Sequence, residues 1–206
     1  MRHLAAVVSL RVAQEIALTE AEGPGRRYAI WTQGCRLRCP GCCNPELFDA
    51  GGGRSESVAT LATRVSSAAS EHKLEGLTLL GGEPLDQLEA TAQLCAHIAA
   101  AGLGVIIFTG YTLTQARNMP HFSSLWENVD TLVDGPFNHH ERTTSPIRWL
   151  GSNNQRARHR TARYANATDW RGPNHAEIQV RPDGSVTVHG FPSEVQHVMG
   201  WLHPSR

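Results

Sequence analysis

Lysine is nearly missing from this sequence of 206 residues, since Lys73 is the only one among 19 basic residues. An excess of either charge is missing too, because 19 acidic residues balance the basic ones. Such a balance gives no general attraction to nucleic acid or to an anionic membrane surface. Apolar runs are also short, and none approaches the roughly 20 residues that span a bilayer. We therefore expect neither nucleic acid nor a membrane as a partner.

The amino terminus lacks a clear export signal. Its apolar stretch from Leu4 to Val8 is cut short by polar residues, and no cleavage site is evident. We expect this segment to begin a first strand and the protein to be cytoplasmic. A disulfide framework is not indicated, because the five cysteines are an odd number and four of them fall in one short loop. A reducing compartment with metal or redox chemistry fits that distribution better.

Strands and helices are expected to alternate through most of the chain. Apolar runs predict strands, the first of them at a sheet edge, at 4–12, 27–32, 77–80, 105–108, 131–133 and 147–150. Helical periodicity predicts longer helices at 57–72 and 86–101 and short ones within 112–127. A capping box of Asp86 and Glu89 would open the second helix. This alternation predicts an α/β fold with a parallel sheet and right-handed crossovers.

The carboxy-terminal quarter departs from this alternation. Residues 156–175 are polar and begin with several arginines, which predicts an irregular basic loop. Alternating apolar residues on both sides of Pro182-Asp183-Gly184 predict a β-hairpin, and 193–202 are expected to close the chain as a short helix. We therefore divide the chain into a core of residues 1–155 and an extension of residues 156–206 packed on the same domain.

Glycines and polar residues gather where the predicted strands end. The carboxyl ends of parallel strands meet at one edge, where α/β folds place their sites. Residues expected to share this edge are Cys35, Glu83, Thr109, Asp134 and Ser152. The sequence therefore predicts one functional rim built from segments that are far apart in the chain.

The loop after the second predicted strand carries the strongest chemical signal. Cys35, Cys39 and Cys42 form a Cys-x3-Cys-x2-Cys pattern, and Cys43 follows directly. Thiolates at such short spacings can converge on one metal centre. Three of them could hold an iron–sulfur cluster with one iron left open. All four could instead hold structural zinc in an interaction module, although adjacent side chains tend to point apart, so spacing alone leaves both interpretations open.

Further motifs surround the cysteine pattern in a characteristic order. They are Gly23-Pro24-Gly25 with Arg27, Trp31-Thr32-Gln33-Gly34-Cys35, Cys39-Pro40-Gly41-Cys42, Gly81-Gly82-Glu83-Pro84, Thr109-Gly110-Tyr111, Leu132-Val133-Asp134-Gly135, and Gly151-Ser152 with Asn154-Gln155. Together they resemble the radical S-adenosylmethionine (SAM) superfamily. In finer detail the pattern is similar to the activating proteins of anaerobic ribonucleotide reductase and to other glycyl-radical-enzyme activases. The joint match is far more specific than any single piece.

The resemblance implies both a fold and a chemistry. The fold would be a partial β/α barrel of the radical SAM type, open on one side, with the β-hairpin added at its carboxy-terminal end. A [4Fe-4S] cluster on Cys35, Cys39 and Cys42 would bind the amino and carboxylate groups of SAM at its open iron. One electron from the reduced cluster would cleave SAM to a 5′-deoxyadenosyl radical that abstracts a hydrogen atom. A flavodoxin- or ferredoxin-type protein would supply the electron.

The same resemblance assigns the remaining rim residues to SAM. The segment Gly81-Gly82-Glu83-Pro84 would face the methionyl ammonium, because an anion and exposed carbonyls suit a cation and glycine lets the backbone come close. Residues expected near the adenosine or closing the pocket are Cys43, Thr109, Gly110, Asp134, Ser152, Asn154 and Gln155.

Two positions depart from the family pattern. Cys43 stands where the family usually has an aromatic residue near adenine, and Leu150 stands where the reductase activases tend to have arginine. These differences leave the radical chemistry intact but open the choice of substrate. The expected function is an oxidoreductase that activates a glycyl radical enzyme. The alternative is a stand-alone radical SAM enzyme that modifies a small molecule or peptide.

Overall fold

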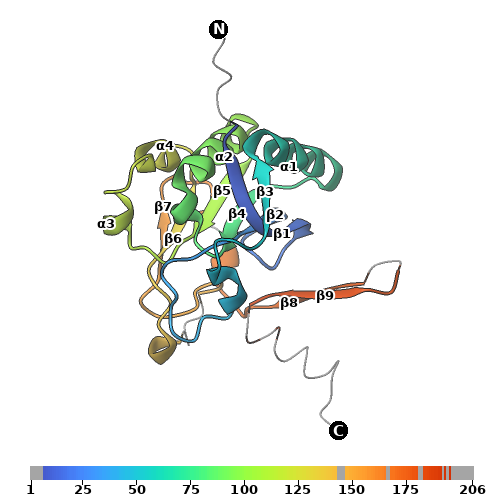
Figure 1. Ribbon diagram of the computed structural model, residues 1–206. Coiled ribbons are helices and arrows are strands. Elements are labelled where there is room, and N and C mark those ends of the chain that lie inside the picture. Colours follow the sequence, from blue (N-terminus) through green and yellow to red (C-terminus); the bar gives the residue numbers. More distant parts are fainter. Residues whose placement is uncertain are drawn as a thin grey trace.

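The main sheet has seven strands in the order β3-β1-β2-β4-β5-β6-β7 (Figure 1). A computed structural model describes residues 7–142, 147–165, 168–180, 183–191, 193 and 195. The strands of the sheet are β1 (Ser9–Thr19), β2 (Arg27–Thr32), β3 (Arg54–Ser57), β4 (Gly76–Gly81), β5 (Gly104–Phe108), β6 (Thr131–Asp134) and β7 (Arg156–His159). The central strands β2, β4, β5 and β6 run parallel, and β1, β3 and β7 pair antiparallel around them. The predicted α/β fold is confirmed, and the predicted parallel sheet is parallel only in its centre, because antiparallel strands flank it on both sides.

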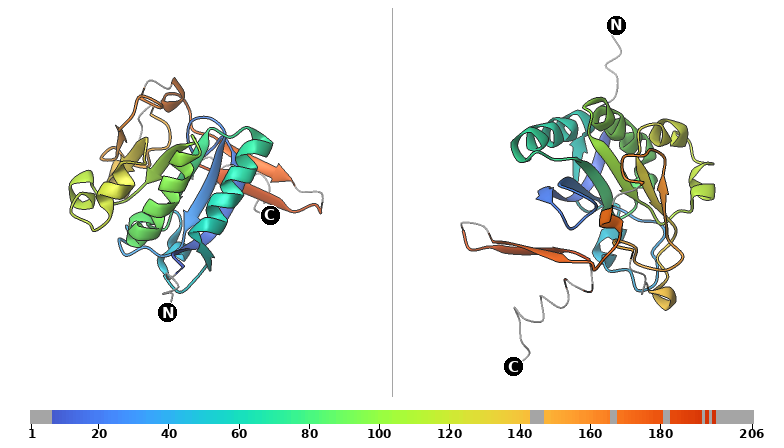
Figure 2. Two further views of the ribbon diagram at one scale, coloured as in Figure 1. Left: turned by 90° about the horizontal axis from the view of Figure 1, so that it is seen from above. Right: turned by 180° about the vertical axis from the view of Figure 1, so that it is seen from behind.

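Helices cover one face of this sheet. The α-helices are α1 (Val58–His72), α2 (Leu88–Ala100), α3 (Leu113–Ala116) and α4 (Phe122–Trp126). The 3-10 helices are η1 (Pro45–Phe48), η2 (Pro84–Gln87), η3 (His139–Glu141) and η4 (Thr168–Trp170). Seen from above, α1 and α2 lie side by side along the sheet (Figure 2). None of the helices in the described ranges is long and apolar enough to cross a membrane.

Apolar side chains at helical spacing form the core on the helical face. Leu61 and Val65 of α1 are fully buried and belong to one cluster with Leu77 and Leu79, which alternate along β4. This matches the period of 3.6 in a helix and of 2 in a strand. Cys95 of α2 is buried in the same cluster.

The other face of the sheet at β5 and β6 is covered by loops and by η4. Trp149, Tyr164 and Trp170 pack against Ile106 of β5 and Val133 of β6. The rings of Trp149 and Trp170 meet edge to face with centroids 5.2 Å apart, a favourable geometry for aromatic pairs. The carboxy-terminal part of the chain therefore builds a smaller second core on the other face of β5 and β6.

The structure corrects the predicted strands in three places. β1 is not an edge strand, because β3 pairs with its outer side. Residues 147–150 form no strand, and Ile147 makes only an isolated bridge to Arg171. Residues 156–159, predicted to be irregular, form β7 and pair with β6. β3 and β7 were missed because edge strands in contact with water are polar and carry no apolar alternation.

The start of α2 also differs from the prediction. Pro84 opens the short helix η2, and Glu83 caps it by accepting a hydrogen bond from the Leu85 N–H. α2 then begins at Leu88, and its N-cap residue Gln87 makes no side-chain cap bond. The predicted capping box of Asp86 is therefore wrong, and its carboxylate binds groups from two other loops instead.

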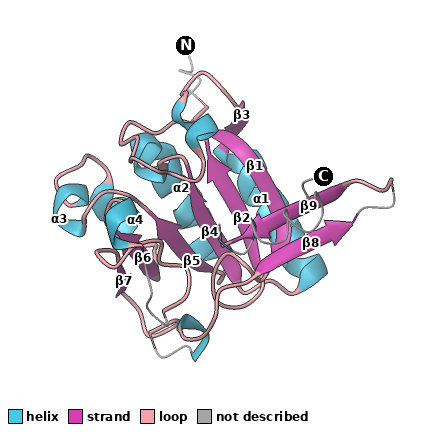
Figure 3. Cartoon of the chain, turned by 90° about the horizontal axis from the view of Figure 1, so that it is seen from below, coloured by secondary structure: helices cyan, strands magenta, loops and turns pink. Residues whose placement is uncertain are grey.

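The predicted hairpin is present as β8 (Ala176–Val180) and β9 (Val186–Gly190). It forms a separate two-stranded sheet that extends away from the main sheet (Figures 1 and 3). Ile178 and Val180 on its outer face are 50% and 69% exposed, while Gln179 on the other face donates to the Leu18 carbonyl. Apart from residues 193 and 195, the predicted closing helix lies outside the described residues.

A fully buried arginine ties the amino-terminal ends of the strands together. The Arg27 guanidinium donates to Thr78 Oγ1 at 2.5 Å, to the Leu77 carbonyl at 2.5 Å and to the Tyr164 hydroxyl at 2.9 Å. It also lies 5.2 Å from the centre of the Tyr164 ring. Burial lowers the pKa of Arg27, and Tyr164 opposes this shift. The guanidinium therefore depends on neutral acceptors to balance its loss of water.

We predict that Tyr164→Phe destabilises the protein by about 1.5–3 kcal/mol, the usual contribution of a hydrogen bond to a charged group. The ring would keep its packing, but a buried N–H on Nη1 of Arg27 would lose its hydroxyl acceptor. Urea unfolding of the cluster-free protein measures the loss. The exposed neighbour Arg26, replaced by alanine, is the control and should change stability by less than about 0.5 kcal/mol. Equal effects of the two variants would contradict the prediction.

Glu22 lies buried beside the hairpin. Burial and, to a smaller extent, the negative charge of Glu177 on β8 raise the pKa of its carboxyl from 4.5 to about 7, against the opposing effect of the Gly190 N–H. Glu177 also contacts the ring of His189 at 3.1 Å. The folded protein therefore binds a proton on Glu22 between about pH 4.5 and pH 7, where the unfolded chain does not.

This difference predicts that the Glu22 contribution to stability falls as pH rises through that window. Replacing Glu22 by glutamine removes the titration, so the gain of the variant over the wild type should grow by up to about 3 kcal/mol between pH 5 and pH 8. Urea unfolding at both pH values measures it. Glu71→Gln on the exposed surface of α1 should show no such growth. Parallel pH curves for wild type and Glu22→Gln would contradict the assignment.

Candidate functional site

The carboxyl ends of β2 and β4 place two predicted motifs in direct contact. We call residues 34–50, which follow β2, the cysteine loop. The Gly82 N–H donates to the Thr32 carbonyl and the Glu83 N–H to the Gly34 carbonyl, both at 2.8 Å. A Cβ atom on Gly82 would lie 2.4 Å from the Gly34 oxygen, so only glycine permits this approach. The two motifs therefore share one rim, as the sequence predicted.

Glu83 connects this contact to the next strand. Its buried carboxylate accepts hydrogen bonds from the Thr109 hydroxyl at 2.7 Å and from the Gly110 N–H at 2.8 Å. Burial raises the pKa of Glu83 to about 7, although these donors and the Leu85 N–H favour the charged form. Leu37 of the cysteine loop lies directly against Gly110, because a Cβ atom on Gly110 would be 2.5 Å from Leu37 Cδ1. Leu37 therefore covers the contact between Glu83 and Gly110.

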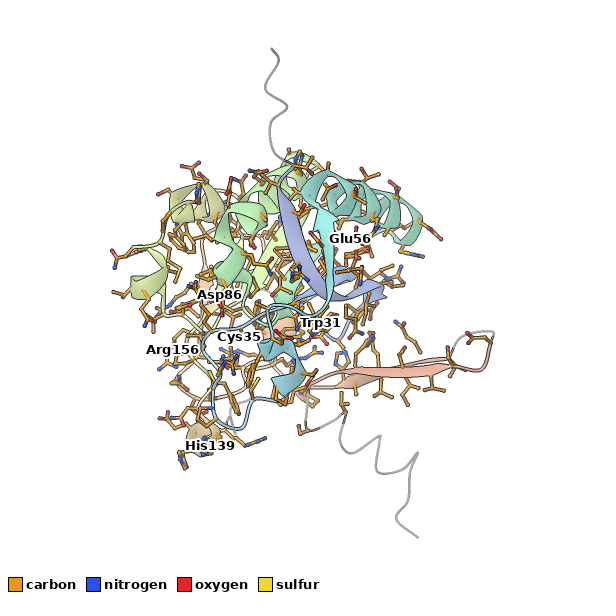
Figure 4. All side chains as sticks on the ribbon, in the orientation of Figure 1. Trp31, Cys35, Glu56, Asp86, His139 and Arg156 are labelled. Carbon is orange, nitrogen blue, oxygen red and sulfur yellow. The ribbon has the colours of Figure 1, made fainter. Side chains whose placement is uncertain are left out.

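Asp86 is a rim residue that sequence reasoning assigned to a helix cap. Its carboxylate accepts hydrogen bonds from the Arg36 N–H and from the Tyr111 hydroxyl, both at 2.8 Å. In Figure 4, Asp86 and Cys35 lie close to each other at this edge of the sheet. No periodic pattern could have revealed this role, because the partners of Asp86 are 50 and 25 positions away.

The cysteines lie along one loop at the rim. Cys35, Cys39 and Cys42 are half-buried and Cys43 is exposed. The Cys42 N–H donates to the Cys39 carbonyl at 3.1 Å, which closes a turn between these two residues. Within the described residues, no three cysteine, histidine, aspartate or glutamate side chains are arranged to hold a metal ion. The three thiols are therefore neighbours on the loop without meeting at one point.

Adjacent Cys42 and Cys43 differ from the expectation that their side chains point apart. A hydrogen bond between the two thiols lowers the pKa of Cys42 and raises that of Cys43. The loop bends at Cys43, so the alternation of an extended strand does not apply. Burial raises the pKa values of Cys35 and Cys39.

Asp134 lies on the helical side of the sheet. Its buried carboxylate accepts hydrogen bonds from the Leu113 N–H at 2.7 Å and from Arg158 Nε at 2.9 Å. Leu132 shares this side, whereas Val133 faces the aromatic cluster on the other side. The Asp134 carboxylate therefore binds the start of α3 and the Arg158 side chain. That Asp134 lies near the adenosine of SAM stays a prediction.

Ser152, Asn154 and Gln155 connect two loops beyond β6. The Ser152 hydroxyl accepts a hydrogen bond from the Asn138 N–H at 3.1 Å, and Asn154 donates to the Pro136 carbonyl at 2.7 Å. The side chain of Gln155 accepts from the Gly151 N–H and donates to the Gly135 carbonyl. These contacts hold residues 135–138 against 151–155, so the polar side chains brace the end of the rim.

Comparison with known proteins decides the family. The family model described as 4Fe-4S single cluster domain matches residues 21–158, which is more than half of the chain. The chain belongs to this 4Fe-4S single cluster domain family. The matched span holds the cysteine loop and every motif on which the resemblance to radical SAM activases rests. That resemblance is confirmed, and a [4Fe-4S] cluster and SAM are the cofactors that the family and its relatives imply.

Named relatives of this 4Fe-4S single cluster domain protein are activating proteins. The anaerobic ribonucleoside-triphosphate reductase-activating protein of Enterobacteria phage T4 is 29% identical over 138 residues, which are 65% of this chain and 84% of the relative. The protein of the same name from Escherichia coli K12 is 29% identical over 142 residues, 66% of this chain and 90% of the relative. A pyruvate formate-lyase-activating enzyme of Staphylococcus epidermidis is 32% identical over 118 residues, 54% of this chain but only 47% of that enzyme.

The cysteine loop of the 4Fe-4S single cluster domain has the donors that such a cluster requires. All five cysteines of the chain are free, and the three in the family pattern are half-buried at the rim. Cluster ligands are thiolates. Because burial raises the pKa values of Cys35 and Cys39, binding there must release protons. The residues fit the group by type, number and burial.

We predict that alanine at Cys35, Cys39 or Cys42 abolishes the cluster, while Cys43→Ala keeps it. A cluster with one open iron needs three protein thiolates, and Cys43 lies outside the spaced pattern. Iron and sulfide analysis after anaerobic reconstitution measures the result for each variant. Cys95→Ala in the core is a control for the loss of a thiol in general. Loss of the cluster in Cys43→Ala as well would favour a site of four thiolates.

Proposed function

We propose that this chain is a radical SAM activase that generates a glycyl radical on a partner enzyme. The similarity to anaerobic ribonucleoside-triphosphate reductase-activating proteins carries this proposal, because the aligned residues cover 84% and 90% of two such proteins. The contact between the cysteine loop and the Gly81-Gly82-Glu83 turn supports it, since both motifs of the resemblance lie at one rim. The chain would act as an oxidoreductase on a protein substrate.

We also propose that the main sheet is the partial β/α barrel of the radical SAM type. The parallel run of β2, β4, β5 and β6 with helical crossovers supports this. The site then lies at the carboxyl ends of the strands, as in closed barrels. The hairpin would belong to the carboxy-terminal extension of residues 156–206, although β7 of that extension joins the sheet.

The chemistry of the site comes from the bound cofactors. When bound and reduced, a [4Fe-4S] cluster would supply the electron for the reductive cleavage of SAM. Cys35, Cys39 and Cys42 would hold this cluster. Glu83 and the carbonyls of Gly81 and Gly82 would bind the methionyl ammonium, and the negative charge of Glu83 suits that cation at pH values above its raised pKa of about 7.

Other residues of the chain would position and shield SAM. Leu37, which lies over Gly110, would exclude water from Glu83. Thr109 and Gly110 would sit near the adenosine because Glu83 holds their loop at the rim. Further proposed pocket residues are Cys43, Pro84, Asp134, Ser152, Asn154 and Gln155.

An external protein of the flavodoxin or ferredoxin type would donate the electron. The cysteine loop supports this, because Cys43 is exposed and the side chain of Arg36 is 76% exposed beside Cys35. Electron transfer requires that the cluster come close to the donor, and a loop at the surface permits it. Free cysteines throughout the chain agree with a reducing compartment such as the cytoplasm.

A stand-alone enzyme that modifies a small molecule or peptide is the second candidate. The observation in its favour is that residues 159–206 lie beyond the span matched by the family model. Leu150, which replaces the arginine typical of reductase activases, is buried beside Trp149 in the aromatic cluster. Residues beyond the matched span would then close a smaller pocket for such a substrate.

We predict that reduced enzyme, SAM and the right glycyl radical enzyme, incubated without oxygen, give the doublet of a glycyl radical in the electron paramagnetic resonance spectrum. Cys42→Ala is the matched control and should give no doublet. Deuterium transfer from a labelled small substrate into 5′-deoxyadenosine, with no doublet for any candidate partner, would favour the stand-alone enzyme. A protein that retains only zinc after anaerobic purification would exclude both functions.

A further inference from the structure

Asp86 gathers hydrogen bonds from two loops of the rim. Its side chain is 9% exposed, and its Oδ2 accepts the Arg36 N–H at 2.8 Å. Its Oδ1 accepts a hydrogen bond from the Tyr111 hydroxyl at 2.8 Å. The same oxygen lies 3.0 Å from both Nε and Nη2 of Arg36. A carboxylate with donors on both oxygens is held in one orientation.

These donors connect Asp86 to both neighbouring strand ends. Arg36 directly follows Cys35 in the cysteine loop. Tyr111 follows the Thr109-Gly110 pair bound by Glu83, and its carbonyl accepts a hydrogen bond from the Gly135 N–H at 3.0 Å. Asp86 thus links the loops after β2, β4, β5 and β6 into one chain of hydrogen bonds across the rim.

The three cysteines differ in how their backbone is held. Cys39 and Cys42 share a turn that is closed by its own hydrogen bond. Cys35 lies before that turn, and its N–H reaches the Phe48 carbonyl only at a long 3.4 Å. Both neighbours of Cys35 are held more firmly. Gly34 donates to the Leu47 carbonyl at 2.9 Å and accepts from the Glu83 N–H at 2.8 Å, and Arg36 makes a charge-assisted bond to Asp86. On the side that leads to the other two cysteines, the place of Cys35 therefore depends on Asp86.

We propose that Asp86 is a positioning residue, which fixes the backbone at Arg36 so that the Cys35 thiol is set for the cluster. This inference rests on the proposed function, because it assumes that Cys35 is a cluster ligand. Groups behind the ligands of a metal site orient them, and changing such groups weakens metal binding by about 10- to 100-fold. Tyr111 supports Asp86 by holding Oδ1.

The hydrogen bond from the Arg36 N–H to Asp86 contributes more to positioning Cys35 than the ion pair between the Arg36 side chain and Asp86. The Arg36 side chain is 76% exposed, so water and salt screen its attraction to Asp86. The Arg36 N–H bond is shared between two loops and belongs to the residue next to Cys35. Arg36→Ala keeps this N–H, whereas Asp86→Ala removes its acceptor.

The test measures iron release from the reconstituted protein to a chelator under anaerobic conditions. Asp86→Ala should release iron about tenfold faster than the wild type. Asp86→Asn keeps an acceptor oxygen, so its rate of iron release should lie between those of the wild type and Asp86→Ala. Tyr111→Phe should increase the rate by only about twofold, as expected from one lost neutral donor. Arg36→Ala and the exposed neighbour Glu89→Gln should release iron at nearly the wild-type rate.

Thermal unfolding of the cluster-free variants separates positioning from folding. The inference expects Asp86→Asn and Tyr111→Phe to melt close to the wild type while they release iron faster. Iron release at the wild-type rate in Asp86→Ala and Asp86→Asn would overturn it. Equal rates for Arg36→Ala and Asp86→Ala would overturn the role of the backbone bond. A wild type that takes up no cluster would instead refute the proposed function, so the two failures are distinguishable.

Discussion

The parallel pairing of β2 with β4 is the constraint on which the rim depends. In its register Thr32 lies beside Gly81, so the cysteine loop and the Gly81-Gly82-Glu83-Pro84 turn leave the sheet at the same level. The bonds from Gly82 to Thr32 and from Glu83 to Gly34 continue this pairing past the strands. A slip by one residue would turn alternate side chains to the opposite face and separate Glu83 from its partners.

Two carboxylates of the β4 turn extend this contact to both sides. Glu83 binds the loop after β5, and Asp86 binds that loop and the cysteine loop together. Because both are largely buried, their donors come from the protein rather than from water. One turn therefore organises the neighbouring loops, which explains how residues far apart in the chain form a single site.

The opposite end of the sheet serves stability. Arg27 gathers carbonyl and hydroxyl acceptors at the amino-terminal ends of the strands, away from the cysteine loop. Its partner Tyr164 belongs to the chain that packs with Trp149 and Leu150 on the second face. An apolar Leu150 suits that place, since a buried arginine there would need acceptors of its own. A substitution at Leu150 can therefore depart from the family pattern without changing a contact of the cysteine loop.

Local patterns sufficed for the central strands, for α1 and for the hairpin, because burial imposes a regular apolar period on them. They failed for the polar strands β3 and β7 and for Asp86, whose carboxylate suits a helix cap equally well. The sequence by itself determined the family, because the cysteine pattern and the motifs around it, taken together, are specific to it. Only the tertiary structure decided which carboxylates support that loop, because hydrogen bonds between residues 50 positions apart depend on strand register and not on local sequence.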